Sequence, residues 1–119
     1  MFALNFYSPL LAAALRDGTK TLTVRLGDKR EKYQEGQVVW VTVGQKHGTR
    51  QKIFTAVIDQ VDAKQLRDVT PREITKDNPA ARQHNDLLEF LSTIYGRRVG
   101  LEDTVTVIHF SRITHPREE

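Results

Sequence analysis

Five short stretches rich in β-branched and aromatic residues occur along this chain of 119 residues, and one helical region separates the last of them from the others. They cover residues 2–7, 19–26, 38–43, 52–61 and 104–110. Runs of this length and composition, bounded by Gly, Pro, Asn and Asp, are typical of strands. A chain this short holds one hydrophobic core, so the five strands are expected to share it. The predicted fold class is α+β, a small, mostly antiparallel closed β-barrel, with a two-layer α+β sandwich as the alternative.

A helix is expected directly after the first strand. Ser8 supplies a hydroxyl N-cap, and Pro9 fits the first helical position. Residues 10–16 are rich in Ala and Leu, and Gly18 tolerates the left-handed conformation that ends helices. The second strand, 19–26, is therefore expected to begin where this helix ends.

A helical pair is expected before the last strand. Thr70 and Glu73 have the spacing of a capping box, and the Asn-Pro pair at 78–79 ends the helix that begins there. Asn85 or Asp86 is the predicted cap of the next helix, which carries an apolar stripe of helical period up to the next glycine.

Residue usage excludes several kinds of chemistry. The sequence has no cysteine, which removes disulfides, cysteine-ligated metals and thiol nucleophiles together. The histidines lack metal-ligand spacing, and no glycine-rich phosphate loop is present, so no metal and no cofactor are expected. The four histidines are His47, His84, His109 and His115.

The longest apolar run, residues 10–15, is far shorter than the roughly 20 residues that cross a bilayer. The first residues lack the basic region of a secretory signal. We therefore expect a cytoplasmic protein with no membrane partner. Its predicted organisation is a single domain over residues 1–113 and a polar tail over residues 114–119.

The segment Lys20-Thr-Leu-Thr-Val-Arg25 lies where the first helix gives way to a strand. In a regular strand Thr21, Thr23 and Arg25 project to one face and Lys20 to the other. Lys20 therefore meets Thr23 only if its backbone still belongs to the turn. The alternative is that the threonines are ordinary strand formers and that both cations are solvated.

This motif, residues 18–25, together with the later segment 35–41, resembles the signature of the ASCH domains, whose barrel is similar to the PUA domain. The resemblance extends to Asp77 and its neighbour, to residues 94–96 and to a closing strand that ends at Phe110. Within that superfamily, the order Lys-Thr-hydrophobic-Thr-hydrophobic-Arg is most similar to small amidohydrolases that cleave N4-acetylcytidine to cytidine and acetate.

The resemblance implies which residues act. Those enzymes are described as using a Lys, a Thr and a Glu, which match Lys20, Thr23 and Asp77 in this chain. Asp77 is a shorter carboxylate than the family's Glu. Glu73 is the alternative acid, although the capping box already accounts for it.

Amide hydrolysis at the exocyclic nitrogen of cytosine needs a nucleophile, a base and an acid for the leaving amine. Thr23 would be the nucleophile. Lys20 accepts its proton only as a neutral amine, which requires that burial or Arg25 lower the pKa of Lys20. A nearby Asp77 favours charged Lys20 instead, so either Asp77 donates the proton to nitrogen or Lys20 stabilises the oxyanion. A covalent acyl-threonine and a water positioned by Thr23 are both open.

A nucleoside substrate also needs recognition. Phe6 and Tyr7 are the candidates for stacking on the pyrimidine, with core packing as the alternative for both. Arg25 is the candidate partner of the base carbonyl or a ribose hydroxyl. Trp40 is expected to fill the barrel.

The competing function is an RNA-binding module or a weak ribonuclease, because PUA-like domains resemble RNA readers and the formal net charge is +3. RNA binding would require an open cleft along a basic stripe and strong salt dependence. The stripe would comprise Lys29, Arg30, Lys46, Arg50, Arg97 and Arg98. Acidic residues interleaved with these make the stripe the weaker alternative.

Overall fold

A computed structural model describes residues 2–45 and 48–114, and it confirms the α+β class. Lys46, His47, His115 and residues 115–119 of the expected tail lie outside the described residues. Along the chain the elements are β1 (Ala3–Phe6), α1 (Leu10–Asp17), β2 (Leu22–Leu26), β3 (Val38–Gly44), β4 (Arg50–Gln65), a 3-10 turn (Leu66–Asp68), α2 (Pro71–Asp77), α3 (His84–Tyr95) and β5 (Thr104–Arg112).

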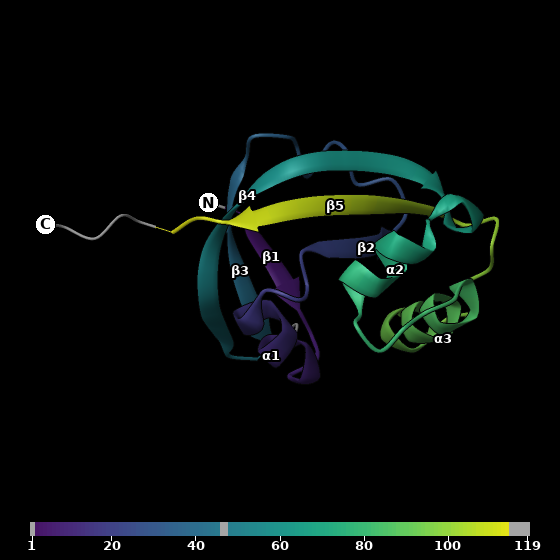
Figure 1. The fold of residues 1–119 in the computed structure, drawn as a ribbon, viewed down its shortest axis with the longest axis horizontal. Helices are drawn as coiled ribbons and strands as arrows, with labels where there is room; N and C mark the ends of the chain where they lie inside the picture. Colours follow the sequence, from purple (N-terminus) through teal and green to yellow (C-terminus); the bar gives the residue numbers. More distant parts are fainter. Residues whose placement is uncertain (1, 46–47, 115–119) are drawn as a thin grey trace, which may run out of the picture.

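The strands form one mixed sheet in the order β1-β3-β4-β5-β2. β1 pairs with β3 in parallel, whereas the other three neighbouring pairs are antiparallel. Figure 1 shows the sheet curling into a half-barrel, with α1 beside β1 and β3 at one end and α2 and α3 together beside β2. β1 and β2 are its two edges.

The expected closed barrel is not confirmed, because no backbone ladder joins β1 to β2 within residues 2–45 and 48–114. We call the gap between these two edge strands the seam. Side chains satisfy the backbone groups along it: Lys20 donates to the Leu22 carbonyl, and Asp77 accepts from the Val24 amide. Since these groups already have partners, the edges need no closing ladder.

Several element boundaries differ from the sequence expectation. β2 begins at Leu22, three residues late, because the Lys20 amide donates to the Ala14 carbonyl and the Thr21 amide to the Lys76 carbonyl. The two helices therefore bind the amides of this segment, although the Thr21 carbonyl still accepts from the Phe110 amide of β5. Pro9, and not Ser8, occupies the cap position of α1.

The later elements also show differences. β4 continues to Gln65, four residues beyond the expected run. α3 also begins with a capping box, in which Gln83 is the cap and Asp86 is the third helical residue. The predicted cap, Asn85 or Asp86, was therefore two or three residues late. Trp40 is 43% exposed with the Lys52 ammonium 5.1 Å from its ring, so the prediction that it fills the barrel was wrong.

Two clusters of buried apolar side chains form the interior. One joins β1, α1 and β3 with parts of β4 and β5, and the other joins β2, α2 and α3 with the opposite part of β5. Phe90 of α3 packs against both clusters. No helix in the described ranges is long and apolar enough to cross a membrane.

The capping box at the start of α2 is present as predicted. The Glu73 amide donates to the Thr70 hydroxyl at 3.2 Å, and the Thr70 amide donates to the Glu73 carboxylate at 2.8 Å. The helix then runs for seven residues and ends at Asp77, before Asn78 in extended conformation. The capping box thus sets the start of the helix whose last residue enters the seam.

Replacing the cap residue, Thr70→Ala, should lower the free energy of unfolding by about 1 kcal/mol, because one helix N-terminal amide loses its acceptor. Urea denaturation measures this change. Thr93→Ala is the matched control, since the Thr93 hydroxyl only donates to the Glu89 carbonyl within an exposed helical face. Equal losses in the two variants would show that the capping box does not stabilise α2.

Candidate active site

Lys20 lies in the segment between α1 and β2 and is 2% exposed. Its ammonium donates to the Leu22 carbonyl at 2.9 Å, to the Asp77 Oδ1 at 2.8 Å and to the Asp77 carbonyl. Three acceptors match the three N–H groups of an ammonium, whereas a neutral amine has only two. The surroundings of Lys20 are therefore built for the charged form.

Opposing effects act on the Lys20 pKa. Burial lowers it most strongly, the charge and hydrogen bond of Asp77 raise it, and the nearby Arg25 cation lowers it further. The net result is a pKa below the ordinary value of a lysine. Lys20 is thus a buried cation that loses its proton more readily than a solvated lysine.

Asp77 reaches the seam from the last position of α2 and is 2% exposed. Its Oδ1 accepts from the Lys20 ammonium and, at 3.2 Å, from the Val24 amide. Its Oδ2 is buried and has no hydrogen-bond partner among the described residues. Buried carboxylate oxygens normally have a donor, so Oδ2 is a free acceptor inside the protein.

Thr23 of β2 is 4% exposed, and its hydroxyl oxygen accepts from Arg25 Nε at 3.1 Å. A second guanidinium nitrogen, Nη2, donates across the seam to the Asn5 carbonyl at 2.9 Å. Arg25 Cζ lies 4.9 Å from the centre of the Phe6 ring, and Lys20 Nζ lies 5.1 Å from the same centre. Phe6 therefore contacts both cations of the site.

These side chains line a small cavity in the seam. All six predicted site residues line it, namely Phe6, Tyr7, Lys20, Thr23, Arg25 and Asp77. Its volume is about 30 Å³, close to the space of one water in the liquid. Since drug-sized ligands occupy pockets of roughly 300–1,000 Å³, a nucleoside enters only if the wall moves.

The seam brings Lys20 and Asp77 into direct contact and places Thr23 in the same cavity, although no hydrogen bond joins Thr23 to either in the described part of the chain. Lys20 meets the geometric condition set by the sequence, because its backbone lies in the turn before β2. Phe6 is a buried wall, whereas Tyr7 is 44% exposed at the rim.

Sequence reasoning missed two polar residues that line the cavity, Asn5 and Tyr95. Asn5 is 7% exposed and accepts from the Thr42 hydroxyl at 2.7 Å. The Tyr95 hydroxyl accepts from the Leu26 amide at 3.1 Å, on the free edge of β2. An amide side chain within an otherwise apolar strand was the available signal for Asn5, whereas Tyr95 was hidden in the apolar stripe of its helix.

Glu73, the alternative acid, does not line the cavity. Its carboxylate pairs with the Lys64 ammonium at 2.9 Å and lies 3.6 Å from the His109 ring. Burial raises the Glu73 pKa, but hydrogen bonds from the Thr70 amide and Lys64 outweigh it and lower the pKa overall. The structure thus brings Asp77, and not Glu73, to Lys20.

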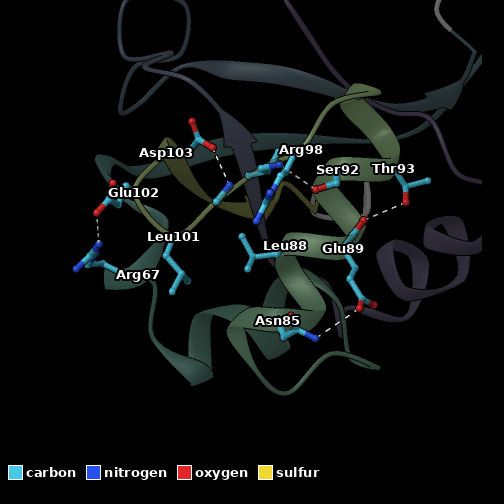
Figure 2. Close-up of a pocket in the computed structure, with 12 residues that line it drawn as sticks. Arg67, Asn85, Leu88, Glu89, Ser92, Thr93, Arg98, Leu101, Glu102 and Asp103 are labelled. Atoms are coloured by element: carbon cyan, nitrogen blue, oxygen red, sulfur yellow. Dashed lines mark hydrogen bonds and ion pairs between the residues drawn. The ribbon is translucent and has the colours of Figure 1, made fainter.

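A larger hollow lies elsewhere, between α3 and the loop that leads to β5 (Figure 2). Leu88 and Leu101 face it, and Arg67 is paired with Glu102 at its rim at 3.0 Å. None of the predicted site residues lines this hollow. The size of this hollow is therefore not evidence that catalysis occurs there.

The predicted basic stripe contains charges that are already paired. Arg30 binds Asp28 at 2.7 Å, and Arg97 lies 3.4 Å from Asp103.

Within the described residues, no group of three or more His, Asp or Glu side chains is placed to hold a metal ion.

Known proteins resemble this chain in structure and not in sequence. The sequence matches no family model and no curated protein. A crystal structure of an ASCH domain from Lactobacillus crispatus JV V101 is similar over 96% of this chain and 80% of its own, with a TM-score of 0.64 and 15% identity. The chain has the ASCH fold.

Two further structures agree with this assignment. The hypothetical protein PH0355 matches over 94% of this chain and 98% of its own, with a TM-score of 0.67 and 12% identity. Protein EF3133 from Enterococcus faecalis V583, of the family DUF984, matches over 95% of this chain and 76% of its own, with a TM-score of 0.69 and 16% identity. Structural similarity at 12–16% identity shows the fold and does not assign an activity.

The Lys20–Asp77 pair should couple strongly in a double-mutant cycle. Lys20→Met alone leaves a buried carboxylate without its cation and should cost about 3–5 kcal/mol of unfolding free energy. Adding Asp77→Asn removes that charge, so the double variant should lose clearly less than the sum of the two single variants. Equilibrium denaturation of all four proteins measures the coupling.

The solvent-exposed pair Arg30–Asp28 supplies the matched control, with Arg30→Met and Asp28→Asn. Water screens this pair, so its coupling should be much smaller. Additive losses at Lys20 and Asp77 would contradict a buried ion pair in the seam.

Proposed function

We propose that this chain is an amidohydrolase that cleaves the N4-acyl amide of N4-acetylcytidine and related N4-acylated cytosine nucleosides. The observation that carries the proposal is that Lys20, Thr23 and Asp77 line one small cavity, with Lys20 and Asp77 in direct contact. The resemblance of residues 18–25 to the small ASCH amidohydrolases supports the choice of substrate. The products would be the cytosine nucleoside and a carboxylate.

Thr23 is the proposed nucleophile. Its oxygen forms a bond to the acyl carbon while its proton passes to Asp77 Oδ2, the buried oxygen without a donor. The carbonyl oxygen becomes an oxyanion next to Arg25, whose guanidinium already contacts the Thr23 hydroxyl. A cation fixed at that position stabilises charge as it develops.

Collapse of the tetrahedral intermediate breaks the bond between the acyl carbon and N4. Asp77 returns its proton to the departing nitrogen, which leaves as the amino group of the nucleoside. Water then attacks the acyl-threonine ester, giving the carboxylate and restoring the Thr23 hydroxyl. These steps consume water alone.

Lys20 acts as a positioning cation in this scheme. One of its hydrogen bonds holds the Asp77 carboxylate through Oδ1, and the other two bind the Asp77 and Leu22 carbonyls at the free edge of β2. A neutral Lys20 would leave one of its three acceptors without a donor. This hydrogen-bond count supports the charged role over that of a base for Thr23.

Thr23→Ala should lower the turnover of N4-acetylcytidine by at least about 1,000-fold, because the nucleophilic oxygen is lost. Thr23→Ser should keep a substantial part of the activity. The assay is release of cytidine, followed by ultraviolet absorbance. Thr21→Ala is the matched control, since Thr21 is exposed and does not line the cavity, and it should remain active.

Near wild-type turnover in Thr23→Ala would exclude Thr23 as the nucleophile. Absence of turnover by folded wild-type protein, with bulkier acyl groups included, would favour the RNA-binding alternative. A salt titration against single-stranded and structured RNA would then test that alternative.

The pH dependence of kcat/KM distinguishes the two forms of Lys20. Because the Lys20 pKa lies below its ordinary value, Lys20 loses its proton at a lower pH than a solvated lysine. Activity that depends on the ammonium should therefore fall as pH rises through this lowered pKa. Activity that rises through the same range would show that neutral Lys20 is the base.

A further inference from the structure

We infer that Asp77 Oδ2 makes the seam selective for ligands that present an N–H donor at position 4 of a pyrimidine. This inference rests on the proposed function and narrows its substrates to secondary amides. Tertiary amides and 4-oxo pyrimidines would be disfavoured at the same site.

Among the described residues, the donors that contact Asp77 bind its Oδ1 or its backbone carbonyl, and none binds Oδ2. The Lys20 ammonium uses its three N–H groups on the Leu22 carbonyl, the Asp77 carbonyl and Oδ1, and the Val24 amide also donates to Oδ1. Arg25 directs Nε to Thr23 and Nη2 to Asn5. Oδ2 is left without a donor although the residue is 2% exposed and lines the cavity.

A carboxylate oxygen in this position discriminates by chemistry. It is an acceptor only, so a ligand N–H restores the hydrogen bond that the protein does not supply. The N4-acyl amide of cytidine carries one such N–H, and the product amino group carries two. The 4-oxo group of uridine is another acceptor, and a methyl group on N4 removes the donor, so both leave the buried oxygen unsatisfied.

The most direct test uses unmodified protein and two substrates. N4-acetyl-N4-methylcytidine keeps the acyl group and lacks the N–H, and its kcat/KM should be roughly 5- to 100-fold below that of N4-acetylcytidine. N4-propionylcytidine is the size control, because it adds a carbon on the acyl side and keeps the N–H. It should lose much less than the methylated amide.

A binding experiment tests the same oxygen without turnover. Cytidine should bind the wild-type protein more tightly than uridine in calorimetric titrations. In Asp77→Asn, the amide oxygen can keep the bonds of Oδ1 and the NH₂ replaces Oδ2, which turns an acceptor into a donor. The preference should then shift from cytidine toward uridine.

The outcomes separate this inference from the proposed function. Equal kcat/KM for the secondary and tertiary amides would overturn the inference and leave the hydrolase standing. Preferential cytidine binding that Asp77→Asn reverses, without any amide hydrolysis, would support the inference and overturn the hydrolase. Equal binding of cytidine and uridine, or binding of neither by folded wild-type protein, would overturn the inference.

Discussion

The buried ion pair between Lys20 and Asp77 is the interaction on which the candidate site depends. It joins the turn after α1 to the last residue of α2, and both partners also bond to the free edge of β2. Burying two charges is costly unless their remaining hydrogen-bonding groups are satisfied. Lys20 meets that requirement fully, whereas Asp77 leaves one oxygen free. The pair therefore connects three elements and leaves one carboxylate oxygen without a donor.

The open seam follows from the same arrangement. A closed barrel would pair β1 with β2, but the edge groups of β2 are taken by Lys20, Asp77 and Tyr95. Arg25 connects the two edges through its side chain instead of a ladder. Apolar residues of both clusters border the seam, and Lys20 and Asp77 are buried there away from water. In such surroundings fixed cations and dipoles stabilise developing charge more strongly than in water.

Local signals predicted much of this fold. The capping box at Thr70 and the left-handed glycine after α1 depend on neighbouring residues, and both are present. The late start of β2 depends in part on the bond from the Thr21 amide to the Lys76 carbonyl, and the open seam on the contact between Lys20 and Asp77, 57 positions away. Local patterns contain neither contact. The apolar stripe of α3 includes Tyr95, but helical periodicity does not show that its hydroxyl reaches the Leu26 amide. The family pattern suggested Asp77 over Glu73, and only the three-dimensional arrangement shows which of them meets Lys20.

A crystal structure of the wild-type protein with bound cytidine is the most direct test of the seam as the active site. We expect the base between β1 and β2, with its exocyclic amino group within hydrogen-bond distance of the Asp77 carboxylate and the Thr23 hydroxyl facing that group. We also expect that the wall near Tyr7 and Tyr95 moves to enlarge the cavity. Cytidine bound only in the hollow between α3 and the loop before β5, with the seam unchanged, would contradict the account.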